Sequence, residues 1–270
     1  MFNFGSNWEK YSENKVTEET IKQASESIHR LCGDIAGKTF LDIGCGSGVF
    51  SIAASDMGAT KVIGFDISKE CIDVSNKNLK RLSTNSLLPE HCWGISQISK
   101  PRGSVEFMIG DVLEMPFLAR IGKFDIVYAW GSLHHTGNMM LAAACANNLV
   151  NRGGLLAMSI YNKHWTSPIW KMVKLAYNNS HRYLQKLIAL SLGVVIYLAK
   201  FITTGKDPLK KERGMDFWYD VVDWVGGYPY EYATPTVIIN EMRHRRNHLV
   251  KTNKPAVPTG CNEFVFRKII

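Results

Sequence analysis

Short apolar runs alternate with longer stretches of mixed polarity over the first 160 residues. Each run is rich in branched and aromatic side chains, and the segments between the runs are long enough for a helix. Runs of this length predict buried strands, and strands that alternate with helices predict a parallel, doubly wound sheet of the α/β class. The five runs are 39–41, 61–66, 105–109, 124–130 and 153–160, and the last of them is fed by a turn at Gly153–Gly154.

The end of the chain follows a different pattern. Residues 248–252 and 263–269 alternate apolar and polar side chains, and a loop that contains Pro and Gly joins them. Alternation of this kind predicts two antiparallel strands that form a hairpin at one edge of the sheet.

One further stretch, Leu187–Ala199, carries no charge over 13 residues. About 20 apolar residues are needed to span a bilayer, so we expect that this helix does not cross one. A buried position in the core or at a dimer interface is the favoured interpretation. Contact with an anionic membrane surface and a movable lid stay open, the former because basic residues flank the stretch. These are Lys174, Arg182, Lys186, Lys200, Lys206, Lys210 and Lys211.

A glycine-rich turn follows the first predicted strand. Gly44, Gly46 and Gly48 alternate with other residues, and Asp42 comes two positions earlier. Glycines at this spacing allow a tight turn from strand to helix, with the helix N-terminus facing a ligand. The spacing differs from the G-x-G-x-x-G of dinucleotide sites, and the turn lacks the Gly-Lys-Ser/Thr end of a phosphate-binding loop. By itself the turn is also compatible with an ordinary strand–helix connection.

Polar residues end the next strands as well. Asp66 follows the second strand about 20 residues after the turn, and a carboxylate there can accept both hydroxyls of a ribose. Asp111 follows the third strand, and residues 130–136 end the fourth. The carboxyl ends of parallel strands meet at one edge of the sheet, which predicts that these residues form one site.

The segment 42–48, Asp-Ile-Gly-Cys-Gly-Ser-Gly, resembles motif I of the class I S-adenosylmethionine-dependent methyltransferases, and the strand-end residues follow in that family's order over residues 38–162. The resemblance implies a Rossmann-like, seven-stranded doubly wound sheet with a helical insertion after the fifth strand. Its branch is that of quinone-biosynthesis and small-molecule enzymes (methyltransferase types 11 and 12) in bacterial glycan and secondary-metabolite clusters. The implied parts are a helical cap (1–37), a cofactor-binding core (38–162), a helical and aromatic insertion on the substrate side (163–235), and a C-terminal helix with a hairpin (236–270).

S-adenosylmethionine is the cofactor that the resemblance implies. Asp66 would hold the ribose hydroxyls and Asp111 the adenine amino group. Tyr11 would close over the cofactor, on resemblance alone. The residues expected at the cofactor are Asp42, Gly44, Cys45, Gly46, Gly48, Asp66, Ile67, Asp111, Val112, Trp130 and Tyr11.

Two histidines are candidates for a general base. His134 and His135 follow the fourth strand, and a neutral imidazole near pH 7 is suited to accept a proton. A structural or positioning role stays open for each of them. The aromatic and acidic segment 213–231 is expected to wall the substrate pocket or to pack an accessory helix on the sheet. Its pocket candidates are Asp216, Trp218, Tyr228 and Glu231. The acids and histidines lack the spacing of a metal site, and the six cysteines form no C-x-x-C pair.

The net charge of +8 is unevenly distributed. Residues 1–160 carry 15 Lys or Arg and 16 Asp or Glu, whereas residues 161–270 carry 17 and 8. A basic second half favours an anionic partner, or is a solvated face. We expect methyl transfer to a small or lipid-linked acceptor, and oxygen is the expected acceptor atom. RNA (tRNA) methylation is the weaker alternative, and a non-catalytic cofactor-binding or membrane-surface adaptor is another. No signal peptide is read at the N-terminus, which predicts a cytoplasmic protein. Peripheral membrane contact and a homodimer stay open.

Overall fold

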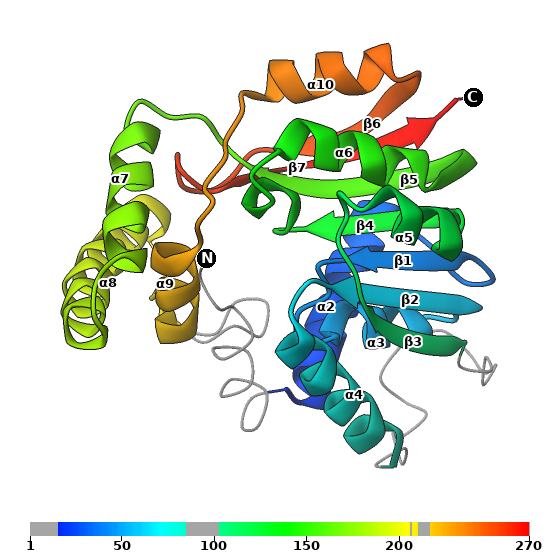
Figure 1. Cartoon of the computed structure of the whole chain (residues 1–270), viewed down its shortest axis with the longest axis horizontal. Helices are drawn as coiled ribbons and strands as arrows, with labels where there is room; N and C mark the ends of the chain where they lie inside the picture. Colours follow the sequence, from blue (N-terminus) through cyan, green and yellow to red (C-terminus); the bar gives the residue numbers. More distant parts are fainter. Residues whose placement is uncertain (1–15, 85–102, 206, 210–216, 270) are drawn as a thin grey trace.

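The fold is built on a seven-stranded sheet, seen in a computed structural model that describes residues 16–84, 103–205, 207–209 and 217–269 (Figure 1). The strand order is β3-β2-β1-β4-β5-β7-β6. The first five strands in this order run parallel, and β7 pairs antiparallel with both β5 and β6. The doubly wound sheet and its C-terminal hairpin are therefore confirmed. The strands are β1 (Thr39–Ile43), β2 (Lys61–Asp66), β3 (Ser104–Ile109), β4 (Phe124–Trp130), β5 (Val150–Tyr161), β6 (Asn247–Asn253) and β7 (Cys261–Lys268).

The fifth strand begins earlier than its sequence indicates. The Gly153–Gly154 pair, expected as the turn before this strand, lies inside β5. Val150 already pairs with Phe124, and the register between β4 and β5 shifts just after that pair. Gly153 has φ +77° and lies at this register shift, inside the strand. The glycine pair therefore marks an irregular position within β5, and the predicted turn before the strand is wrong.

Helices cover both faces of the sheet (Figure 1). Residues of α2, α3 and α4 pack with one face in a core around Ile28, Phe40 and Tyr128. Residues of α5, α6 and α10 pack with the other face in a core around Val127, Leu156 and Phe264. The helices are α2 (Glu18–Cys32), α3 (Val49–Asp56), α4 (Lys69–Thr84), α5 (Met115–Ile121), α6 (Met139–Asn148) and α10 (Pro235–His244).

Three further helices stand beyond the carboxyl ends of the strands (Figure 1). They are α7 (Ser167–Asn178), α8 (Arg182–Thr204) and α9 (Phe217–Gly226), and we call them the helical lobe. The lobe has a small core of its own, made by Tyr177, Ala189, Phe217, Val221 and Val225. Residues 227–234 lead back to the sheet, where Ala233 forms a bridge with Asn162.

Helix α8 differs from the expectation that Leu187–Ala199 is buried in the core. Within that stretch only Ala189 and Gly193 are buried, while Leu187, Leu190 and Val194 are each more than half exposed. The interpretation of the stretch as a core helix is therefore wrong. The helix has 23 residues, and by length and composition its part Arg182–Ala199 is long and apolar enough to cross a membrane. The charge-free stretch underestimated the length of the helix, because the helix also includes the charged residues Arg182 and Lys186.

Candidate active site

The glycine turn connects β1 to α3 by left-handed backbone. Gly44, Gly46 and Gly48 have φ values of +72°, +54° and +77°, which favour glycine. Two of these glycines are also closely packed. A Cβ on Gly44 would overlap the side chain of Ser132, which follows β4. A Cβ on Gly48 would overlap Phe107. Two of the three glycines are thus required both by conformation and by close packing.

Helix α4 holds this turn from behind. Ser75 Oγ donates to the carbonyl of Gly46 (2.9 Å), and Asn78 Nδ2 donates to the carbonyl of Ser47 (2.9 Å). Both side chains are buried, at 0% and 2% exposure. The sequence analysis missed them. The sequence signal that could have identified them is a pair of polar residues, three positions apart, on the otherwise apolar face of a predicted helix.

The two strand-end aspartates follow neighbouring strands, and Asp66 is bonded to the turn. Asp66 Oδ2 accepts from the backbone N–H of Gly46 (3.1 Å), and Oδ1 accepts from that of Ser68 (3.0 Å). Burial raises the pKa of Asp66, and these backbone hydrogen bonds oppose the rise. Asp111 follows the neighbouring strand, and its Oδ1 accepts from Leu113 N (2.8 Å). Of the hydrophobic neighbours expected at the cofactor, Ile67 is 60% exposed whereas Val112 is buried.

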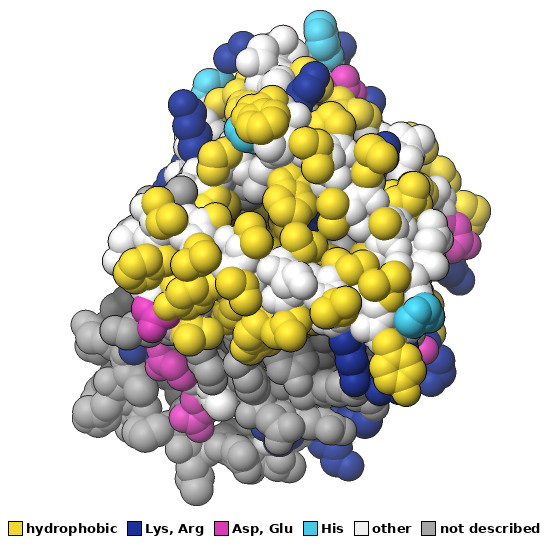
Figure 2. Space-filling view, turned by 90° about the vertical axis from the view of Figure 1, so that its left-hand side faces the viewer, with side chains coloured by type: hydrophobic (Ala, Val, Ile, Leu, Met, Phe, Trp, Pro, Cys, Tyr) yellow, Lys and Arg dark blue, Asp and Glu magenta, His cyan; other side chains and the backbone are white. Residues whose placement is uncertain are grey.

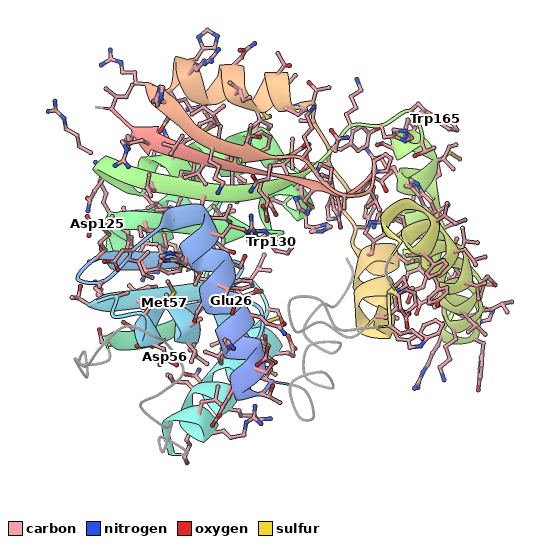
Figure 3. All side chains as sticks on the ribbon, turned by 180° about the vertical axis from the view of Figure 1, so that it is seen from behind. Glu26, Asp56, Met57, Asp125, Trp130 and Trp165 are labelled. Carbon is pink, nitrogen blue, oxygen red and sulfur yellow. The ribbon has the colours of Figure 1, made fainter. Side chains whose placement is uncertain are left out.

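Three other residues expected at the cofactor are Asp42 at the end of β1, Cys45 within the turn and Trp130 at the end of β4. Asp42 is 3% exposed and accepts from Ser51 Oγ (2.7 Å), and burial raises the pKa of its carboxyl to about 7. Cys45 is buried, which raises the pKa of its thiol. Trp130 Nε1 donates to Glu263 Oε1 (3.1 Å). Figure 3 shows Trp130 at the end of β4 nearest the helical lobe and Asp125 at the opposite end.

The two histidines differ in accessibility. His134 is 1% exposed, its Nδ1 lies 3.2 Å from the carbonyl oxygen of Ser159, and burial lowers its pKa well below the ordinary value. His135 is only partly buried, and its Nδ1 lies 2.7 Å from the carbonyl oxygen of Pro229. A carbonyl can only accept, so this Nδ1 carries the proton and Nε2 is the basic nitrogen. Burial lowers the pKa of His135 to about 4.

The segment after α9, which was expected on the substrate side, contacts the histidines. Glu231 N donates to the carbonyl of His134 (3.1 Å), and the Glu231 carboxylate accepts from Met139 N at the start of α6 (3.0 and 3.2 Å). Tyr228, partly buried, precedes Pro229 in the same segment. Trp218 lies farther away, in the helical lobe, with its ring against Gly193 of α8. Asp216 and Tyr11 lie outside the described residues.

A buried lysine stands behind the histidines, and the sequence analysis did not single it out for the site. Lys174 of α7 is 0% exposed, and its Nζ lies 4.5 Å from the ring centroid of Trp224 and 4.8 Å from that of Tyr230. The ring of Tyr161 connects this cation to the histidines, with its centroid 4.1 Å from that of His134. Cation–π contacts offset part of the cost of burying the ammonium group. Nothing in the local sequence distinguishes Lys174 from the other lysines of a basic segment.

Comparison with known proteins identifies the family. A family model described as a methyltransferase domain matches residues 16–218. The chain belongs to the class I S-adenosylmethionine-dependent methyltransferases. Among curated relatives of this methyltransferase, ribosomal protein L11 methyltransferase of Vibrio campbellii is 37% identical over 86 residues, which are 32% of the chain and 26% of the relative. The Escherichia coli protein of the same name is 31% identical over 124 residues, 46% of the chain and 36% of the relative. The methyltransferase thus spans about a third or less of these relatives.

Solved structures share the fold over nearly the whole chain. Magnesium protoporphyrin IX methyltransferase (ChlM) from Synechocystis PCC 6803, crystallised with bound SAH, has a TM-score of 0.55 at 15% identity, covering 97% of this chain and 93% of that one. An O-methyltransferase family protein from Burkholderia thailandensis has a TM-score of 0.53 at 13% identity, covering 93% of this chain and 55% of that one. At these identities the similarity shows the fold alone.

The residues of the turn fit the cofactor of the family. The left-handed backbone of Gly44, Gly46 and Gly48 forms the turn, and the Asp66 carboxylate stands at its mouth, where it accepts from the N–H of Gly46. The exposed side chain of Ile67 next to it offers an apolar surface for a purine. In the methyltransferase, Asp66, Ile67 and Asp111 would therefore hold S-adenosylmethionine above the glycine turn.

Proposed function

We propose that the methyltransferase acts on a hydroxyl oxygen of a small or lipid-linked molecule. The proposal rests on His135, a partly buried imidazole just after β4. Its Nδ1 donates to the carbonyl of Pro229, so its Nε2 is the nitrogen that can accept a proton. The bound cofactor supplies an electrophilic methyl group whose leaving group needs no proton. The chain has to orient the acceptor, exclude water and take up one proton.

The low pKa of His135 keeps its imidazole neutral at pH 7 and makes it a weak base. The proton of a hydroxyl becomes strongly acidic as its oxygen forms a bond to the methyl carbon. An imidazole with a pKa of about 4 is neutral at pH 7 and can accept such a proton. Burial is the main cause of the low value, and the nearby charge of Lys174 adds to it. His134, fully buried against Tyr161, would position His135, since the two rings lie 4.5 Å apart.

The surroundings favour an acceptor with apolar parts. The rings of Tyr161, Tyr230 and Trp224 surround Lys174 behind the histidines, and Tyr228 lies in the same segment as Tyr230. Tyr161 and Tyr230 are themselves buried, so they make the surroundings of the histidines apolar, and such surroundings suit a small molecule with apolar parts. The neighbour from Burkholderia thailandensis named an O-methyltransferase family protein is compatible with this choice.

Transfer of a labelled methyl group tests the proposal. The full chain would be incubated with methyl-labelled S-adenosylmethionine and two matched panels, alcohols and phenols of increasing apolarity, and amines of the same skeletons. We expect label in the hydroxyl panel as an ether that is stable to mild base, with rates that rise with apolarity.

Three outcomes would overturn the proposal. Label found only in the amines would indicate nitrogen methylation. Label found only in added carboxylic acids of the same skeletons, as a base-labile ester, would indicate a carboxyl acceptor. Label found only in added ribosomal protein or RNA would indicate a macromolecular acceptor, which the names of the curated relatives make a specific rival for protein.

A further inference from the structure

The outer face of the helical lobe is apolar. On α8, exposed side chains recur every three or four residues at Leu187, Leu190, Val194 and Leu198, which places them in one stripe along the helix. Figure 2 shows hydrophobic side chains gathered across this face of the molecule. We call the following set the lobe face: Trp165, Ile169, Met172 and Leu175 on or next to α7, and Tyr183, Leu184, Leu187, Leu190, Val194, Val195, Leu198, Phe201 and Ile202 on α8.

The lobe face is not the packing side of these helices. Tyr177 of α7 and Ala189 of α8 point into the core of the lobe with Phe217. Met172, 73% exposed, lies about 200° around α7 from the buried Lys174. Both helices therefore bury one apolar side and expose a second one. Contiguous exposed apolar surface on this scale is typical of a contact with a membrane or another protein.

The charge around the lobe face distinguishes a membrane from a second protein as its partner. Residues 163–206 contain seven Lys or Arg and no Asp or Glu. Lys163, Lys171, Arg182 and Lys186 are among them and are exposed, and Figure 2 shows Lys and Arg side chains around the apolar region. A second copy of the chain would bring an equally positive face against this one. An anionic lipid surface offers an apolar layer and opposite charge together.

We propose that the lobe face docks on the surface of an anionic lipid bilayer, with α7 and α8 lying in the interface. The length of α8 would also allow a crossing. However, Ala189 packs in the lobe core with Phe217 and Val221 of α9, and Asn178 of α7 bonds to the carbonyl of Gly226 at the end of α9. These contacts hold one side of α8 against protein that is continuous with the sheet domain.

Docking would place the membrane on the outer side of α7, whose inner side faces the candidate site. Lys174 faces the aromatic rings next to the histidines, while Met172, two residues away, faces outward on the lobe face. An acceptor carried in the bilayer could thus approach along α7. The docking itself does not depend on which atom is methylated, so it can stand or fall apart from the proposed function.

Vesicle flotation with the full chain tests the docking. The probes are vesicles of phosphatidylcholine alone and vesicles in which roughly a third of the lipid is phosphatidylglycerol. We expect flotation with the anionic vesicles at low salt, and its loss at high salt because exposed charges are screened within about 10 Å at 0.1 M and 3 Å at 1 M. Lys186→Gln should weaken partitioning about fivefold, the effect of one basic residue near an anionic surface.

Matched variants separate the lobe face from exposed apolar residues elsewhere. The double variant Leu190→Glu/Val194→Glu should lower partitioning roughly tenfold or more, since it puts two carboxylates in the apolar stripe. Leu141→Glu/Val237→Glu changes residues of similar exposure on α6 and α10, and it should float like the unchanged chain. Retained binding of S-adenosylmethionine shows that both variants are folded.

Other results would overturn the docking. Equal flotation of the two double variants would mean that the lobe face is not used. Binding to both vesicle types that resists high salt and alkaline carbonate would indicate a membrane span. Absence of flotation, together with a dimer in sedimentation equilibrium that Leu190→Glu/Val194→Glu dissociates, would assign the face to a second copy.

Discussion

Two carboxylates near the glycine turn, the partly buried Asp66 and the buried Asp42, have different surroundings. Asp66 accepts two backbone N–H groups at the mouth of the turn. Asp42 accepts a hydroxyl hydrogen bond from Ser51 beneath the turn, and burial raises its pKa to about 7. Backbone N–H donors favour the charged form of a carboxylate. Asp66 is therefore the residue suited to receive the hydroxyls of the cofactor.

Replacement of these carboxylates by amides should separate their roles. Asp66→Asn should weaken the binding of S-adenosylmethionine by about 1.5–3 kcal/mol, the scale for a hydrogen bond to a charged group. Asp42→Asn is the matched control and should leave affinity nearly unchanged, because its amide oxygen can still accept from Ser51. Isothermal titration calorimetry measures both. Equal affinities for Asp66→Asn and the unchanged chain would mean that the ribose is held elsewhere.

The histidine pair can be separated in the same way. His135→Asn should lower kcat by about 10²–10⁴-fold, as for a lost general base, without a change in cofactor affinity. His134→Asn should act chiefly by lowering stability, since His134 is 1% exposed and packs on Tyr161.

The pH profile provides a second measure of His135. With a pKa of about 4, the imidazole is neutral from pH 6 to 8, so its contribution to the rate should be constant there and fall toward pH 4 as it becomes protonated. A kcat for His135→Asn within twofold of the unchanged chain would exclude a base role.

The sequence could predict the residues of this site whose roles are local. The glycine spacing and the place of Asp66 after a strand were enough to predict the tight turn and a carboxylate beside it, because a turn and a strand end are determined by neighbouring residues. Lys174 and Tyr230 could not be predicted. They lie 56 residues apart in the sequence and meet only because the segment after α9 returns to the sheet.

At the scale of elements, α4 supports the glycine turn through Ser75 and Asn78. Ser75→Ala would leave the partly buried carbonyl of Gly46 without this donor, so we expect the free energy of unfolding to fall by about 1 kcal/mol. A looser turn should also weaken cofactor binding. Asn76→Ala, an exposed position on the same helix, is the control and should be close to neutral. Urea titrations of the two variants check this, and equal stabilities would show that the turn needs no support from α4.

The elements themselves were predictable to different degrees. The β6–β7 hairpin was predicted from two short apolar runs joined by a loop that contains Pro and Gly. The burial of β7 does not alternate, because this strand lies between β5 and β6 and residues 262–266 are all buried. The ends of α8 were not predicted, since its N-terminal cap is the side chain of His181 and its C-terminal cap is Gly205 in a left-handed conformation. These caps lie outside the charge-free stretch, and so the stretch showed little more than half of the helix.

At the scale of the whole molecule, Glu263 ties together elements that are far apart in the sequence. Its carboxylate pairs with Arg30 of α2 (2.7 and 3.0 Å) and accepts from Trp130 of β4 and Asn253 of β6. Burial alone would raise the pKa of Glu263, but the hydrogen bonds from Arg30, Asn253 and Trp130 outweigh it and lower the pKa to about 2.

The low pKa of Glu263 makes the stability of the fold depend on pH. The pKa lies below the ordinary value of 4.5, so the ionised carboxylate contributes stability that is fully present above about pH 4.5 and is lost as the pH falls toward 2. Glu263→Gln should lower the free energy of unfolding at pH 7 by about 1–3 kcal/mol. In urea titrations its deficit should shrink between pH 4.5 and pH 2.5. Glu241→Gln, which breaks the more exposed pair with Arg245, should cost about 0.5 kcal/mol or less. A deficit of Glu263→Gln that stays constant with pH would show that packing at this position, and not its charge, connects α2 to the sheet.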